Sequence, residues 1–160
     1  MDTTDQHGSN SVNVGRVFPE SLPFMWEPVK ALLEKHPQHF LDYTSAETVY
    51  EYLMENRLEL WIGLHQRDIE LACITHLFGH KKKYLEILWI GGKNFERYAE
   101  EGLKKLEVWA AIAGASELRV GGRKGLLRLL ASRGFKQQRV ELAKTISYVK
   151  IADDEVARLN

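Results

Sequence analysis

The chain is almost without cysteine: Cys73 is the single one among 160 residues. One cysteine forms no internal disulfide and cannot supply a cysteine-based zinc site. It stands in the apolar segment LACITHLF, where a small buried side chain is expected rather than a nucleophile. The histidines His65, His76 and His80 have no cluster of carboxylates beside them in the sequence, so no metal site is predicted.

Long apolar runs are missing as well. No segment approaches the roughly 18 apolar residues that a membrane span needs. The first residues are polar and acidic, unlike the start of a signal peptide. We therefore expect a cytoplasmic protein that has no membrane partner.

The sequence also has no excess of either charge, with 22 basic and 22 acidic residues. Without a net field a nucleic-acid partner is not expected. Basic side chains do gather between Arg119 and Arg133, which is typical either of a face that holds an anionic partner or of a solvated surface. The length and the 44% hydrophobic fraction fit one soluble domain.

Residues 1–17 are rich in Asp, Thr, Ser, Asn and Gly and show no hydrophobic periodicity. They predict a disordered N-terminal arm, followed by one folded domain over residues 18–160. Within that domain a capping box of Thr44 and Glu47 predicts the start of a helix.

Hydrophobic spacing predicts the order of the remaining elements. Helical stripes alternate with short runs of period two, and a strand–helix–strand crossover follows an antiparallel meander. This order indicates an α/β domain with a mixed, mostly antiparallel sheet flanked by helices. We expect helices over residues 21–36, 44–53, 95–113 and 124–132, and strands over residues 58–65, 69–78, 83–90, 116–120, 137–141 and 144–151.

Two segments resemble the GNAT superfamily of acetyl-CoA-dependent N-acetyltransferases. Leu106-Glu107-Val108-Trp109-Ala110 is similar to the family's Leu-Glu-x-Trp-Ala pattern, and Gly134-Phe135 matches the end of its Leu-Tyr-x-Lys-x-Gly-Phe segment. The resemblance implies a sheet whose two central strands splay apart. It also implies acetyl-CoA as the cofactor, with its diphosphate at the start of the helix at residues 95–113.

The family's glycine loop aligns with residues 94–99, where only Ala99 fits the pattern and acidic residues surround the turn. A glycine pair lies just upstream and predicts either an anion-binding turn or an ordinary strand-to-helix turn. The cofactor-binding residues that the resemblance implies are Ile90, Gly91, Gly92, Asn94, Arg97, Ala99 and Arg123.

The catalytic residues that the resemblance implies are fewer. Leu130 stands where the family often has a tyrosine that protonates the departing thiolate. Glu86, on the strand at residues 83–90, is the remaining candidate, as a base that removes a proton from the substrate amine. The alternative is that Glu86 simply points at solvent or at Lys83.

Gly122-Arg123-Lys124-Gly125 is similar to a motif of short GNAT-like proteins encoded by tailed bacteriophages. This implies a phage origin and a place in the infected host's cytoplasm or in the virion. Two functions stay open: a divergent protein that has lost catalysis and binds a phage structural or host protein, or an N-acetyltransferase. The missing loop and tyrosine favour the first. An open cleft would favour the second, whereas a cleft closed by Phe95, Trp89 or Tyr98, or an exposed apolar patch, would favour the first.

Overall fold

The computed structural model describes residues 12–38, 40–121, 128, 130–138 and 142–144 of the chain. The chain divides into two compact units, residues 1–121 and residues 122–160. In the second unit the amide of Phe135 donates to the carbonyl of Leu130, and Gly134 between them has a φ of +89°. Most of the helix expected at 124–132 and of the closing hairpin at 137–151 lies outside the described residues.

The first unit holds a five-stranded sheet in the order β1-β2-β3-β4-β5. Every neighbouring pair is antiparallel except β4 and β5, which are parallel and joined by the crossover helix α4. The predicted mixed, mostly antiparallel sheet is therefore confirmed. The elements are β1 (Asn13–Val17), α2 (Leu22–Lys35), the short 3-10 helix η1 (Phe40–Asp42), α3 (Ala46–Met54), β2 (Glu59–His65), β3 (Asp68–Phe78), β4 (Lys83–Gly92), α4 (Phe95–Ile112) and β5 (Ala115–Val120).

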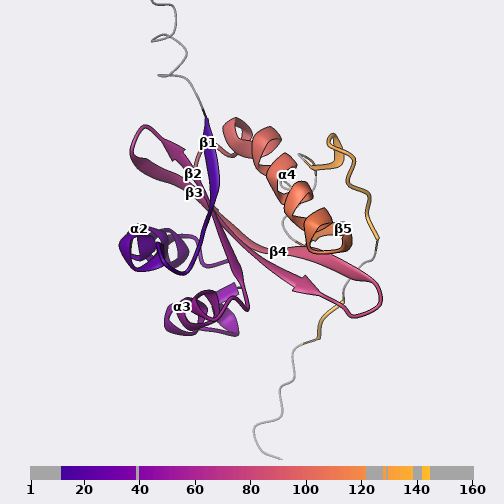
Figure 1. The fold of residues 1–160 in the computed structure, drawn as a ribbon, viewed down its shortest axis with the longest axis horizontal. Coiled ribbons are helices and arrows are strands. Elements are labelled where there is room, and N and C mark those ends of the chain that lie inside the picture. Colours follow the sequence, from indigo (N-terminus) through magenta and orange to yellow (C-terminus); the bar gives the residue numbers. More distant parts are fainter. Residues whose placement is uncertain (1–11, 39, 122–127, 129, 139–141, 145–160) are drawn as a thin grey trace, which may run out of the picture. The chain divides into compact units, whose positions relative to one another are not determined.

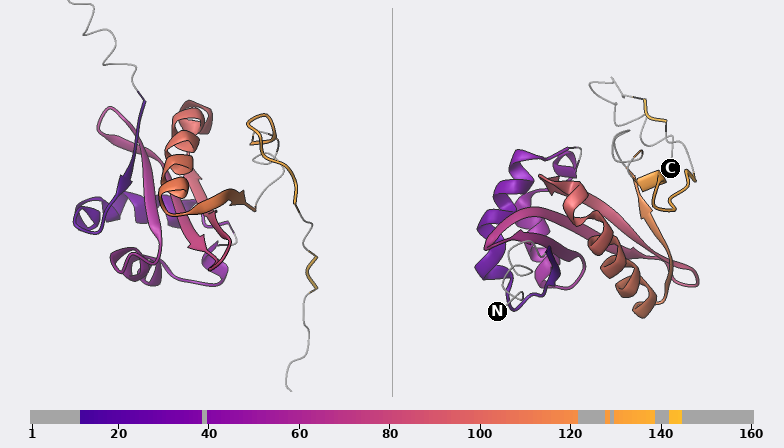
Figure 2. Two further views of the ribbon diagram at one scale, coloured as in Figure 1. Left: turned by 45° about the vertical axis from the view of Figure 1, so that its right-hand side comes forward. Right: turned by 90° about the horizontal axis from the view of Figure 1, so that it is seen from above.

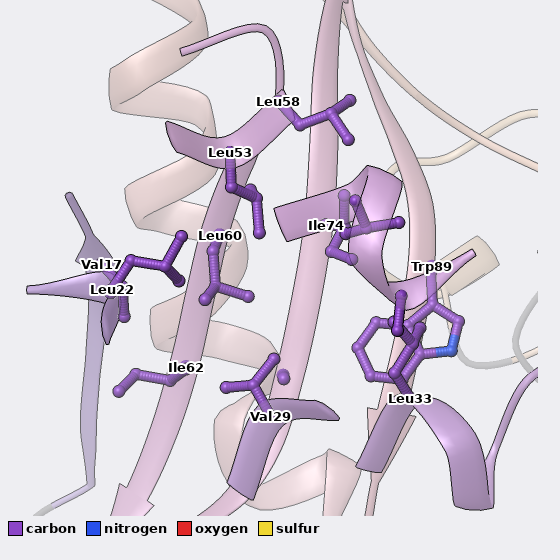
Figure 3. Close-up of a cluster of buried hydrophobic side chains, with 13 residues drawn as sticks. Val17, Leu22, Val29, Leu33, Leu53, Leu58, Leu60, Ile62, Ile74 and Trp89 are labelled. Atoms are coloured by element: carbon purple, nitrogen blue, oxygen red, sulfur yellow. The ribbon is translucent and has the colours of Figure 1, made fainter. Parts of the chain in front are cut away.

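Helices cover both faces of this sheet, with α2 and α3 on one face and α4 on the other (Figures 1 and 2). The larger apolar core lies between the sheet and the α2–α3 layer, where Val29, Leu33, Leu60, Ile74 and Trp89 meet (Figure 3). A second core lies under α4 and includes Leu85, Ile87 and Leu106. Each helix buries one apolar stripe, as the 3.6-residue periodicity requires.

Two one-residue bulges change which face of the sheet the side chains point to. Ile74 pairs with Trp89 while Thr75 pairs with Ile87, which leaves Leu88 as an extra residue in β4. Gly63 pairs with Leu71 while Leu64 pairs with Ile69, which leaves Glu70 as an extra residue in β3. A bulge turns the side chains beyond it to the other face. For this reason Leu85 and Ile87 pack under α4, whereas Trp89 packs under α2 and α3.

The pairing of the two parallel strands, β4 and β5, stops before β4 ends. β5 pairs with β4 only as far as Ile87, opposite Val120, while β4 continues to Gly92. Among the described residues, the stretch of β4 from the Leu88 bulge onward has no strand beside it on that edge. The resemblance implies that two strands splay apart here, and this stays a prediction because residues 122–127, which follow β5, lie outside the described residues.

The predicted boundary between the disordered arm and the folded domain, after residue 17, is wrong. Asn13–Val17, assigned to a disordered arm, form β1 and pair antiparallel with β2, with Val14 and Val17 buried. The signal was weak because a strand of five residues with one glycine follows a polar stretch. Residues 1–11 lie outside the described residues.

The predicted cap of α3 is one residue off. The Oγ of Ser45, not the side chain of Thr44, accepts a hydrogen bond from the amide of Thr48 at 3.2 Å. Both residues are good cap formers, and the backbone of Ser45 has the extended conformation that a cap requires.

Candidate functional site

The part of β4 beyond the bulge is held by the chain segment that follows α2. The Nε1 of Trp89 donates to the carbonyl of His36 at 2.7 Å, and the Nε2 of Gln38 donates to the carbonyl of Ile90 at 2.6 Å. These two hydrogen bonds hold the connection between α2 and α3 against the part of β4 that does not pair with β5. Ile90, predicted to contact the cofactor, thus has its carbonyl oxygen engaged by this chain's own Gln38.

The glycine pair forms a tight turn into α4. Gly92 has a φ of +133°, and a Cβ at this position would lie 2.1 Å from the carbonyl oxygen of Glu70. The amide of Lys93 donates to that same carbonyl at 2.9 Å. At Gly91 a Cβ would lie 2.2 Å from the ring of Trp89. Both glycines are therefore required by neighbours within the fold.

The first turn of α4 is organised around the buried carboxylate of Glu70, which is 6% exposed. Oε1 accepts from the hydroxyl of Tyr98 and from a guanidinium nitrogen of Arg97, each at 2.7 Å. Oε2 accepts from the side-chain amide of Asn94 at 2.6 Å. These bonds, that of Tyr98 first, hold the pKa of Glu70 below its usual value, while burial and the same carboxylate raise the pKa of Tyr98 to about 12.

Main-chain donors at the start of α4 remain available. Asn94 precedes the helix in a left-handed conformation and makes no capping bond with its side chain. The amide of Arg97 donates to the carbonyl of Asn94 at 3.0 Å, but within the described chain the amides of Phe95 and Glu96 have no acceptor. Free amides at a helix start carry partial positive charge and attract anions.

The predicted cofactor residues thus divide into groups. Gly92, Asn94 and Arg97 come together, but around Glu70, so that the two side chains are engaged within the chain. Ala99 is buried within α4 rather than exposed in the turn. Arg123 lies outside the described residues. Glu70 is the residue that the sequence prediction missed, although an acid directly before the apolar run LACI in this strand is a visible signal.

Glu86 lies close to the point where the pairing of β4 with β5 ends. It faces His76 of β3 and Arg119 of β5 across the sheet, one residue before the last β4–β5 pair. Because Leu85 and Ile87 pack under α4, Glu86 points to the face on which α2 and α3 lie. In the part of the chain that is described, its carboxylate has no hydrogen bond or ion pair.

Three aromatic residues would favour an interaction protein if they closed a cleft, and two of them are interior. Trp89 and Tyr98 are each 1% exposed. Trp89 is part of the core beneath α2 and α3, and Tyr98 packs against Gly63 and bonds Glu70. Phe95 is only partly buried.

A separate groove of about 780 Å³ lies between β1 and α4. Phe18, Val108 and Ile112 line it and are exposed, Ile112 by 74%. The guanidinium of Arg16 lies 4.6 Å from the ring centres of both Phe18 and Trp109. An exposed apolar patch of the kind that favours protein interaction is therefore present.

Beneath this groove lies the buried carboxylate of Glu59, which accepts a bond from the Nε1 of Trp109 at 3.2 Å. Burial raises the pKa of Glu59, an effect that Trp109 and the charge of Arg16 only partly offset. Burial also lowers the pKa of Arg16, whose Nε has no hydrogen-bond partner among the described residues.

We expect Glu59→Gln to stabilise the protein at neutral pH. As pH rises above the ordinary glutamate pKa, the unfolded chain loses its proton before the folded protein does, so the free energy of unfolding falls until the raised folded pKa is passed. Glutamine does not ionise, so the variant avoids this fall in the free energy of unfolding. Its Tm should therefore exceed that of the wild type at pH 7 but not at pH 4. The exposed Glu107→Gln is the control, and a Tm at pH 7 below that of the wild type would contradict the expectation.

Several other polar residues near the sheet have partners within the fold. Arg119, from the predicted basic face, bonds Glu117 at 3.1 Å and stacks 3.9 Å from the ring of Tyr84. Glu117 also pairs with Lys82 at 2.9 Å. His76 contacts the carbonyl of Arg57 at 2.8 Å. Over the described residues, no three potential ligands cluster as a metal site would require, and no helix is long and apolar enough to cross a bilayer.

Solved structures of acetyltransferases share this arrangement. An aminoglycoside acetyltransferase from an uncultured soil metagenomic sample, in complex with sisomicin, matches with a TM-score of 0.63 at 14% identity, over 86% of this chain and 98% of that one. A predicted acetyltransferase with acetyl-CoA from Clostridium acetobutylicum matches with a TM-score of 0.63 at 14% identity, over 84% of this chain and 96% of that one. AAC(6')-Iy in complex with a bisubstrate analog matches with a TM-score of 0.64 at 12% identity, over 86% of this chain and 99% of that one.

The chain has the GNAT acetyltransferase fold. No protein-family model and no curated protein sequence matches it. At these identities the likeness is one of fold alone, and activity must be argued from the site. In this fold β4 is the strand that continues past its parallel neighbour β5, and α4 is the crossover helix that follows it.

Proposed function

We propose that the chain binds an acyl-CoA and transfers its acyl group to an amine. One observation carries this proposal: β4 runs past the end of β5 and leads through a glycine turn into α4, whose first two amides have no acceptor among the described residues. The fold likeness to acetyltransferases, one of them determined with acetyl-CoA, supports the same reading.

The residues present fit acyl-CoA, but through other contacts than those the resemblance implies. The amides of Phe95 and Glu96 and the exposed Lys93 would hold the diphosphate, since Asn94 and Arg97 are engaged with Glu70. Bound acyl-CoA would supply an activated thioester. Glu86, which is partly buried and unpaired within the described part of the chain, would accept a proton from the acceptor amine.

Calorimetric titration with acetyl-CoA tests the proposal. We expect a Kd in the micromolar range, and about tenfold weaker binding for Lys93→Glu because it reverses a charge beside the diphosphate. Lys104→Glu makes the same change farther along α4 and should leave the Kd nearly unchanged. Glu86→Gln should keep binding and lower the rate of transfer to a panel of amines by about 100-fold.

Absence of binding at millimolar acetyl-CoA would contradict the proposal. Binding without any effect of Lys93→Glu would instead contradict the assignment of the diphosphate to this turn. Salt should weaken the interaction, since the contacts are electrostatic.

A second candidate is a protein-interaction function without catalysis. The groove between β1 and α4 favours it, because exposed apolar side chains gather there beside the outer edge of β1. A phage structural or host protein, the kind of partner that the sequence resemblance implies, would then be the ligand, and the protein would act in the infected host or in the virion. The acetyl-CoA titration separates the two candidates.

A further inference from the structure

The position of Glu70 in the sheet is unusual for a carboxylate. It is the extra residue of the β3 bulge, directly before Leu71, which pairs with Gly92. The bulge directs its side chain beneath the start of α4 and not into solvent. An isolated buried charge would be costly, so its partners must compensate it.

Those partners all belong to the turn and to the first turn of α4. The main-chain carbonyl of Glu70 accepts from the amide of Lys93, and the side chain accepts from Asn94, Arg97 and Tyr98. One residue of β3 thus fixes four of the six residues from 93 to 98. It leaves two residues between them unbound, Phe95 and Glu96, and these are the ones whose amides have no acceptor in the part of the chain that is described.

The charge of Arg97 is compensated by this contact. Its side chain is 40% exposed, but its guanidinium lies 2.7 Å from Oε1 of Glu70, so the pair has little net charge to offer an approaching anion. The anion would be met mainly by main-chain amides, whose directions depend on how the turn is held. Tyr98, with its pKa raised to about 12, stays a hydroxyl donor at neutral pH.

We propose that Glu70 is the positioning residue of the cofactor-binding turn: it orients the Phe95 and Glu96 amides and withdraws Arg97 from direct contact with the diphosphate. This inference rests on the proposed acyl-CoA function. It differs from the alternative in which Arg97 binds the diphosphate itself, because the two predict opposite effects of removing the Glu70 charge.

The experiment is a comparison of Glu70→Gln, Arg97→Gln and wild type by acetyl-CoA calorimetry and steady-state transfer. If Glu70 positions the turn, Glu70→Gln weakens binding and raises KM by about tenfold while kcat changes little, because the reacting atoms are not touched. If Arg97 is the true ligand, Glu70→Gln frees its charge and tightens binding, and that result would overturn the inference.

Two further variants keep the test decisive if Glu70→Gln folds poorly. Tyr98→Phe removes one bond to Glu70 and retains the ring that packs on Gly63, and should raise KM two- to threefold with kcat kept. Glu70→Asp retains the charge and should restore part of the affinity lost with glutamine. Unchanged affinity in Tyr98→Phe and in a folded Glu70→Gln overturns this inference alone. Failure of the wild type to bind acetyl-CoA overturns the proposed function as well.

Discussion

Replacing Gly92 with alanine is expected to lower the free energy of unfolding by about 3 kcal/mol. Its φ of +133° is strained for any side chain, and the new Cβ would lie 2.1 Å from the Glu70 carbonyl oxygen. Because that oxygen also accepts the Lys93 amide, neither strand can shift without losing a hydrogen bond. Urea denaturation followed by circular dichroism measures the effect.

Gly102→Ala is the matched control for Gly92→Ala. Gly102 lies inside α4, and a Cβ there would meet only a methyl group of Val14, at 3.9 Å. The same substitution should therefore stabilise the protein by roughly 0.5–1 kcal/mol through helix propensity. If the free energy of unfolding of Gly92→Ala lies within about 0.5 kcal/mol of the wild-type value, the result would contradict the close packing described for this turn.

Trp89→Ala is expected to cost about 3–5 kcal/mol of stability. The side chain is 1% exposed, fills the core under α2 and α3, and donates to the carbonyl of His36. Its loss leaves a cavity and also an unfastened α2–α3 connection. Urea midpoints of the variant and the wild type give the difference.

Trp89→Phe separates the two contributions. It keeps an aromatic ring in the core and removes the bond to His36, and a cost of about 1–2 kcal/mol is expected. A phenylalanine variant as unstable as the alanine variant would show that the hydrogen bond, not the ring, dominates. An alanine variant costing less than about 1 kcal/mol would contradict the packing described for Trp89.

The sequence predicted β2, β3, β4, α4 and β5 in their observed order because these elements show clear hydrophobic periodicity. β1 escaped prediction since a five-residue edge strand is stabilised by its pairing with β2 rather than by its own pattern. The choice between Thr44 and Ser45 as the cap depends on backbone angles that two adjacent cap formers do not reveal.

The candidate site was harder to predict for a tertiary reason. Motif alignment placed the family's loop at residues 94–99, but the partner of Asn94 and Arg97 is Glu70, more than 20 residues earlier in the chain. Only the bulge in β3 brings that carboxylate beneath α4, and a bulge leaves no mark in hydrophobic spacing. The sequence could name the donors of this network but not their acceptor.

The extra residue Leu88 has a consequence for how the protein unfolds. Because of it, one strand contributes Leu85 and Ile87 to the core under α4 and Trp89 to the core under α2 and α3. Neither helical layer can detach without disturbing the strand on which the other rests. The first unit should therefore exchange its core amide hydrogens as one cooperative block, with β4 among the last segments to open.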